Sequence, residues 1–294
     1  MIRLAVRVRE AQAELVLAEL LELAPSGVEE VAGEAGTPTA GTVEYAVYGA
    51  PGELPAIGQL QAAVGGALVE VSTSEVPDDW HERWREFHRP VLVAAPAGRP
   101  AGPAVPSLRV RPPWEPAEAT LGDGWREIVI DPGMAFGTGG HATTRLCLEL
   151  LLELAGADAA RGPVLDVGTG SGVLAIAARM LGFQPVLALD NEPESVAAAA
   201  ENARVNGVAI EVRRLDLRHD ELPPPGAVML ANLLRPLLIE LARRIERAPA
   251  HLLAGGLLSD QADEVADVFA RRLGLREHAR RERGEWAALW LTGA

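Results

Sequence analysis

The segment Val-Leu-Asp-Val-Gly-Thr-Gly-Ser-Gly, residues 164–172, decides how the second half of this chain folds. Its first four residues are typical of a short buried strand, and a helical pattern begins near Val173. Glycines let a backbone turn sharply and let a ligand approach it closely. Val173 stands where a dinucleotide fingerprint has glycine, and Asp166 precedes the turn. A carboxylate suits a cationic ligand group better than a pyrophosphate, so the segment predicts a strand–turn–helix unit that binds such a group.

Strand-like and helical patterns alternate around this turn. The apolar strand-like runs cover 164–167, 186–189, 210–213, 227–231 and 252–258, and the helical patterns between and after them cover 172–181, 194–205, 235–247 and 261–273. Such alternation predicts a parallel sheet with helices on both faces. Two last runs, 275–281 and 285–292, are close enough to form only a hairpin, so the final strand should be antiparallel. We therefore expect a Rossmann-like α/β domain with a mainly parallel seven-stranded sheet, over residues 127–294.

The first 76 residues predict a second, smaller domain. Strands are indicated over 2–9, 42–48 and 67–76, with helices over 17–24 and 54–64. The order β-α-β-α-β is typical of a small α+β domain, and we expect a ferredoxin-like fold.

Residues 77–126 are expected to join the two domains as a helix and linker. Trp80, Trp84 and Phe87 lie on one face of a short helical pattern, and 94–106 is rich in alanine, proline and glycine.

Composition and charge exclude several classes of protein. The net charge of −14 disfavours nucleic-acid binding, which needs a basic surface, so no direct nucleic-acid readout is expected. No apolar run reaches the ~18–20 residues that cross a bilayer. The N-terminus lacks the apolar core of a signal peptide, and the single Cys147 fits a reducing compartment, so we expect a cytoplasmic protein. Residues 1–76 hold three basic and eleven acidic residues, which favours a basic partner or simply a solvated acidic face.

Polar residues follow three of the expected strands, where parallel sheets bind ligands. Asp190 stands 22 residues after Gly168, a spacing at which a carboxylate accepts both hydroxyls of a ribose; it is equally suited to cap the next helix. Asn191 follows it and joins the candidate set. Asp216 is a candidate for an adenine amine or an ordinary turn residue. Asn232 ends an apolar run and is a candidate for holding the acceptor, with a plain loop asparagine as the alternative.

The glycine-rich segment 131–144 precedes a helix expected over 145–154. It contains four glycines, Phe136 and several hydroxyl groups, and such a loop can fold over a bound ligand. His141, Thr143 and Thr144 are candidate contacts, although one capping threonine would serve a plain helix entry and a lone histidine is more often structural. No residue spacing resembles a metal site.

Taken in order, these segments resemble the PrmA family of bacterial methyltransferases that modify ribosomal protein L11. The matching segments are 131–144, 164–172, Asp190, 201–207 and 231–234, with weaker markers at 79–80, 111–114, 258–261 and 285–286. The resemblance implies the fold of a class I methyltransferase, S-adenosyl-L-methionine as cofactor, and methyl transfer to lysine and N-terminal amines. It also implies that the N-terminal domain recognises the substrate, a basic ribosomal protein. We expect a monomer.

The resemblance makes Thr144, Gly168, Asp190 and Asn232 cofactor contacts, and Asn232 is also the candidate catalytic residue. The full candidate set for the cofactor is Phe136, His141, Thr144, Asp166, Gly168, Gly170, Gly172, Asp190, Asn191, Asp216 and Asn232. Departures from the family pattern occur at Gly140 and Asp260.

Three alternatives remain. The first is a lysine methyltransferase that acts on a different protein. The second is a methyltransferase of glutamine or adenine, and the third is a non-catalytic cofactor-binding protein with the same fold. Glutamine and adenine methyltransferases resemble Asn-Pro-Pro-Tyr at the strand end, whereas this chain has Asn-Leu-Leu-Arg at 232–235, which disfavours them.

Overall fold

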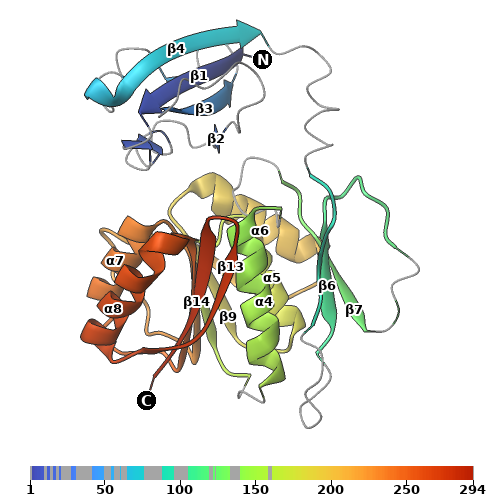
Figure 1. Cartoon of the computed structure of the whole chain (residues 1–294). Helices are drawn as coiled ribbons and strands as arrows, with labels where there is room; N and C mark the ends of the chain where they lie inside the picture. The colour runs from blue at the N-terminus through green and yellow to red at the C-terminus, as the bar shows by residue number, and fades with distance from the viewer. Residues whose placement is uncertain are drawn as a thin grey trace. The chain divides into compact units, whose positions relative to one another are not determined.

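The structure is a computed structural model of the whole chain, and its contacts divide the chain into two compact units, residues 1–87 and 88–294 (Figure 1). The residues that it describes are 2–9, 12–13, 16–17, 20, 28–30, 42–49, 54–55, 60, 65–75, 88–95, 105–118, 122, 124–132, 140–157 and 161–293.

A seven-stranded sheet forms the centre of the second unit, in the order β10-β9-β8-β11-β12-β14-β13. The strands are β8 (Val164–Val167), β9 (Val186–Asp190), β10 (Glu211–Arg214), β11 (Val228–Asn232), β12 (His251–Leu258), β13 (Arg276–Arg283) and β14 (Trp286–Thr292). The first five are parallel, and β14 pairs antiparallel with both β12 and β13. The mainly parallel sheet and its antiparallel last strand are therefore confirmed.

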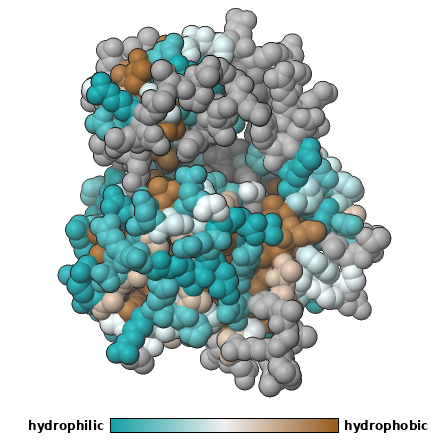
Figure 2. All heavy atoms as spheres, in the orientation of Figure 1, coloured by the Kyte–Doolittle hydropathy of each residue, from teal (hydrophilic) through white to brown (hydrophobic). Residues whose placement is uncertain are grey.

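Helices cover both faces of this sheet. They are α4 (Ala142–Gly156), α5 (Val173–Met180), α6 (Pro193–Val205), α7 (Arg235–Arg244) and α8 (Ala262–Leu273), with a 3₁₀ turn, η3, at Ser259–Gln261. Successive strand residues point to opposite faces. Val164 therefore joins one core with α4 and α5, and Leu165 joins another with α7 and α8. Hydrophilic side chains cover most of the view in Figure 2 over the second unit, and none of the described helices is long and apolar enough to span a membrane.

A three-stranded sheet also belongs to the second unit, and the sequence patterns did not indicate it. It consists of β5 (Val91–Val93), β6 (Ser107–Arg111) and β7 (Trp125–Val129). Short strands separated by proline- and glycine-rich stretches give too few residues for a periodic signal. Part of the segment expected to be a linker thus packs its apolar residues against α4 and α5 in one core.

The first unit contains an antiparallel sheet in the order β2-β3-β1-β4. Its strands are β1 (Ile2–Arg9), β2 (Glu29–Glu30), β3 (Thr42–Gly49) and β4 (Leu68–Glu75), with a 3₁₀ turn, η2, at Gly65–Ala67. The sheet confirms a small N-terminal domain, and it adds β2, which is too short to be predicted. The helices expected over 17–24 and 54–64 lie largely outside the described residues, as does the whole aromatic segment 80–87.

Candidate active site

The turn between β8 and α5 depends on glycine. Gly168, Gly170 and Gly172 have φ of +73°, +52° and +84°, the left-handed region that favours glycine. A Cβ on Gly168 would lie 2.2 Å from Leu233 Cδ2, and one on Gly172 would lie 3.1 Å from Ala199 Cα. Any other residue would thus be strained in this turn, and at Gly168 it would also require the Leu233 side chain to shift.

Asp190, at the end of β9, holds this turn. Its carboxylate accepts hydrogen bonds from the backbone N–H of Gly170 at 2.8 Å and of Glu192 at 3.0 Å. Burial raises the pKa of Asp190, while the backbone hydrogen bonds act in the opposite direction. Glu192 occupies the N-cap position of α6, so the capping alternative for Asp190 was wrong. The neighbouring Asn191 is exposed and donates to Glu192 Oε1 at 3.4 Å.

Asp166 lies buried beneath the turn. The Thr169 hydroxyl donates to its Oδ2 at 2.6 Å, whereas Oδ1 is buried and accepts no hydrogen bond from the described residues. Burial, assisted by the negative charge of Asp190, raises the pKa of Asp166 to about 7. A buried carboxylate oxygen without a partner is costly, and an ammonium group that bonded to it would offset that cost.

Asn232 is the last residue of β11. The next residue, Leu233, packs its side chain against Gly168 of the glycine turn. Asn232 Nδ2 donates to the hydroxyl of the buried Thr144 on α4, 3.3 Å away, and its Oδ1 is buried without a partner among the described residues. A Cβ on Gly255 of β12 would lie 2.8 Å from that Oδ1 and 2.4 Å from Cys147 Sγ. The fold therefore brings together two candidate residues 88 positions apart and leaves one acceptor atom of the pair unused.

His141 and Asp216 have well-defined local roles. His141 is the N-cap of α4, where its ring accepts from Thr143 N, and it packs edge-on against Trp286 with ring centroids 4.8 Å apart. Burial lowers the pKa of His141. Asp216 accepts from Arg218 N and contacts His219 Nδ1 at 2.7 Å, the pattern of a turn residue. These contacts favour the structural alternative for both.

Phe136 lies outside the described residues, with the rest of 133–139. Within the described part of the chain, no group of three or more His, Cys, Asp or Glu side chains could hold a metal ion.

Two asparagines, Asn202 in α6 and Asn206 at its C-cap, have contacts that the sequence patterns did not predict. Asn202 donates to Ser171 O at 2.9 Å and accepts from Asp131 N at 3.0 Å. Asn206 accepts from Val129 N at 2.8 Å and donates to Val129 O at 2.7 Å. Their spacing of four residues, which places two amides on one helical face, was the signal available in the sequence.

Comparisons with known proteins agree with this geometry. A family model described as "Ribosomal protein L11 methyltransferase (PrmA)" matches residues 53–293. A ribosomal protein L11 methyltransferase of Geobacter sulfurreducens is 39% identical over 238 residues, which cover 79% of this chain and 73% of that protein. One of Geobacter metallireducens is 41% identical over 216 residues, 72% of this chain and 65% of that protein.

A solved structure is also similar. The ribosomal protein L11 methylase of Lactobacillus delbrueckii subsp. bulgaricus matches with a TM-score of 0.57 and 28% identity, covering 70% of this chain and 98% of that one. The expected Rossmann-like methyltransferase fold is thereby confirmed. With a family match over most of the chain and relatives near 40% identity, the chain belongs to the PrmA family of S-adenosyl-L-methionine-dependent methyltransferases.

Proposed function

We propose that this enzyme transfers methyl groups from S-adenosyl-L-methionine to amines of ribosomal protein L11, at lysine side chains and the N-terminal α-amine. The observation that carries the proposal is the hydrogen-bonded pair of Asn232, half-buried at the end of β11, and the buried Thr144 on α4. Because Asn232 Nδ2 is bound to Thr144, its free Oδ1 is a hydrogen-bond acceptor, the kind of group that orients an amine.

The glycine turn and its two carboxylates suit the cofactor. We assign Asp166 Oδ1 to the ammonium group of its methionine part and Asp190 to its ribose hydroxyls. Gly168, Gly170 and Gly172 provide the close backbone approach. Bound there, the cofactor supplies a methyl group on a sulfonium, which a neutral amine attacks in line.

The amine must lose a proton before it can attack. A free lysine has a pKa of about 10.4, so deprotonation near pH 7 costs about 4–5 kcal/mol. Desolvation in a partly buried site lowers that pKa and therefore that cost. Asn232 Oδ1 and nearby backbone carbonyls then hold the amine in line, and close positioning supplies much of the rate, so no strong general base is required.

We further propose that residues 1–76 recognise the protein substrate by shape and charge. Two of their three arginines are already neutralised within the sheet, since Arg3 pairs with Glu44 and Arg7 pairs with Glu44 and Glu70. The net charge of −8 over this segment is left to attract a basic protein. We expect a monomer that acts in the cytoplasm, without reading nucleic acid directly.

The test is incubation of the purified enzyme with labelled cofactor and purified ribosomal protein L11, followed by mass spectrometry. Label on lysine and α-amine nitrogens is expected, and L11 whose amines were chemically acetylated beforehand is the matched control substrate, because an amide nitrogen cannot attack the methyl group. The Asn232→Ala variant should lower the rate at saturating cofactor. If L11 stays unlabelled while another protein of a ribosomal extract is labelled, the substrate assignment is wrong. If S-adenosylhomocysteine binds but no protein is labelled, the chain is a binding protein.

A further inference from the structure

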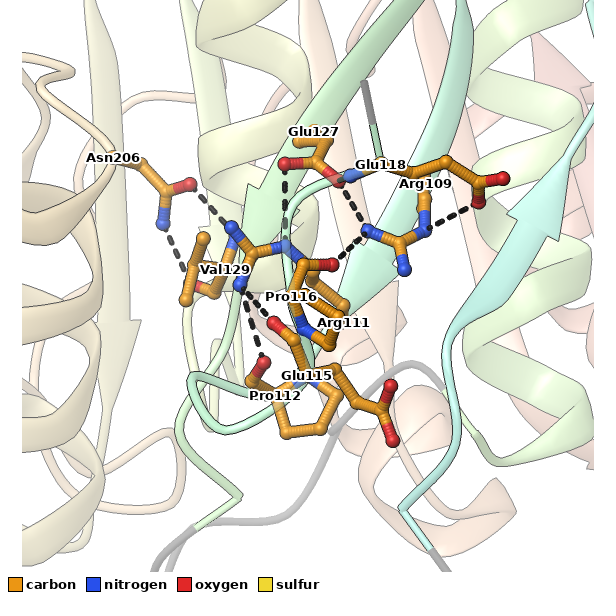
Figure 3. Close-up of polar contacts among 9 residues, drawn as sticks. All are labelled: Arg109, Arg111, Pro112, Glu115, Pro116, Glu118, Glu127, Val129 and Asn206. Carbon is orange, nitrogen blue, oxygen red and sulfur yellow. Dashed lines mark hydrogen bonds and ion pairs between the residues drawn. The ribbon is translucent and has the colours of Figure 1, made fainter. Parts of the chain in front are cut away.

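One edge of β7 is paired with side-chain amides instead of a strand. On its other edge β7 pairs with β6, where Ile130 N donates to Arg111 O at 2.9 Å. On the edge that faces α6, Val129 N and Val129 O bind the amide of Asn206, and Asp131 N binds Oδ1 of Asn202. Figure 3 shows the Asn206 amide against both backbone groups of Val129. The two asparagines thus provide the hydrogen bonds that a neighbouring strand would provide.

Asn202 also reaches the glycine turn, which Asn206 does not. Its Nδ2 donates to Ser171 O at 2.9 Å, inside the turn between β8 and α5. The side chain of Asn202 is therefore a direct bridge between that turn and Asp131, the first residue of the 131–144 segment. Asn202 is buried, with 3% of its surface exposed, and both ends of its amide are bound to the protein.

The other end of the bridge is firmly held, because β7 is anchored to β6 by charge. Both carboxylate oxygens of Glu127 are bound, one by Arg109 and the other by Arg111 Nε at 3.2 Å (Figure 3). Arg109 and Arg111 also donate to carbonyls of the turn that follows β6, at Pro116 and Glu115. A movement of the glycine turn relative to Asp131 must therefore break a contact of Asn202.

We propose that Asn202 is a positioning residue for cofactor binding, which fixes the glycine turn at a set distance from the start of the 131–144 segment. Asn206, four residues later at the C-cap of that helix, binds Val129 of β7 and the backbone carbonyl of Asn202 but has no bond to the glycine turn. The proposal rests on the proposed cofactor site at the glycine turn. It adds to that site a residue, Asn202, whose side-chain amide forms hydrogen bonds only with the protein's own backbone.

The experiment compares S-adenosylhomocysteine binding by calorimetry in the full chain for Asn202→Ala and for the matched control Asn206→Ala. Both variants should lose thermal stability, because each loses buried hydrogen bonds. Loss of the bridge should raise the Kd of Asn202→Ala about fivefold or more, whereas Asn206→Ala should stay within about twofold of wild type. Asn202→Ser, which keeps a small polar group, serves if the alanine variant does not fold. A Kd for the Asn202 variant within twofold of wild type, or equal weakening by both, would overturn the proposal.

A second measurement needs no variant. In the wild-type chain, S-adenosylhomocysteine should slow hydrogen exchange of the Asp131 amide more than that of the Val129 amide, because only Asp131 is linked to the turn through Asn202. Equal effects at both amides would count against the bridge.

The Asp190→Ala variant distinguishes failure of the proposed cofactor site from failure of the Asn202 bridge. If it binds S-adenosylhomocysteine normally, the proposed cofactor site fails; if it loses binding while Asn202→Ala keeps it, only the bridge fails.

Discussion

Replacing Asp166 with asparagine should stabilise the free enzyme at high pH and not at low pH. Burial raises the pKa of Asp166 from 3.8 to about 7. At about 1.36 kcal/mol for each pKa unit, ionising this carboxyl costs roughly 4 kcal/mol more in the folded protein than in the unfolded chain. Because the folded pKa is the higher one, the folded state holds the proton more tightly, and this group lowers the unfolding free energy as pH rises from about 4 to about 7. Asp166→Asn cannot ionise, and its amide oxygen can still accept from the Thr169 hydroxyl.

Urea unfolding at pH 4 and pH 8, without cofactor, measures the effect. The variant should exceed wild type by up to about 4 kcal/mol at pH 8, and the two should converge near pH 4. An ammonium group beside Asp166 favours the charged carboxylate, so wild-type affinity for S-adenosylhomocysteine should rise between pH 5 and pH 8 more than that of the variant. A stability difference that is the same at both pH values would refute the assigned burial cost, and parallel pH profiles of binding would refute the assigned ammonium contact.

Four further predictions concern the site and the substrate domain. Asp190→Ala should weaken S-adenosylhomocysteine binding at least about tenfold in calorimetry, since hydrogen bonds to a charged group contribute about 1.5–3 kcal/mol each; an unchanged affinity would end the ribose assignment. Gly168→Ala should lower the melting temperature and cofactor affinity together, because a Cβ there meets Leu233 at 2.2 Å with φ at +73°; a variant with wild-type values for both would contradict this. Raising salt above about 0.1 M should raise the KM for protein substrate and leave cofactor affinity nearly constant, because exposed charges are screened. Replacing glutamates 10, 14, 19 and 22 with glutamine should likewise raise that KM, and no change in it would show that the acidic balance is only a solvated surface.

Patterns along the chain were sufficient for the main sheet. Strands β8 to β12 begin and end within a residue or so of their apolar runs, because buried parallel strands and the helices between them have distinct periodicities. The hairpin of β13 and β14 followed from its short connection alone. The strands β2, β5 and β7 escaped this reasoning because they lie outside the regular alternation of strands and helices, and pairing partners rather than periodicity determine them.

For the site, the sequence by itself determined where backbone must turn and which strand ends carry polar groups, since glycine spacing and strand ends are local properties. Only the tertiary structure decided which polar groups meet. Asn232 finds Thr144 across 88 residues, and Asn202 joins Ser171 to Asp131. It also decided which atoms remain without partners, Asp166 Oδ1 and Asn232 Oδ1 in the described part of the chain. Hydrogen bonding and burial depend on distances between elements far apart in sequence, and packing alone sets those distances.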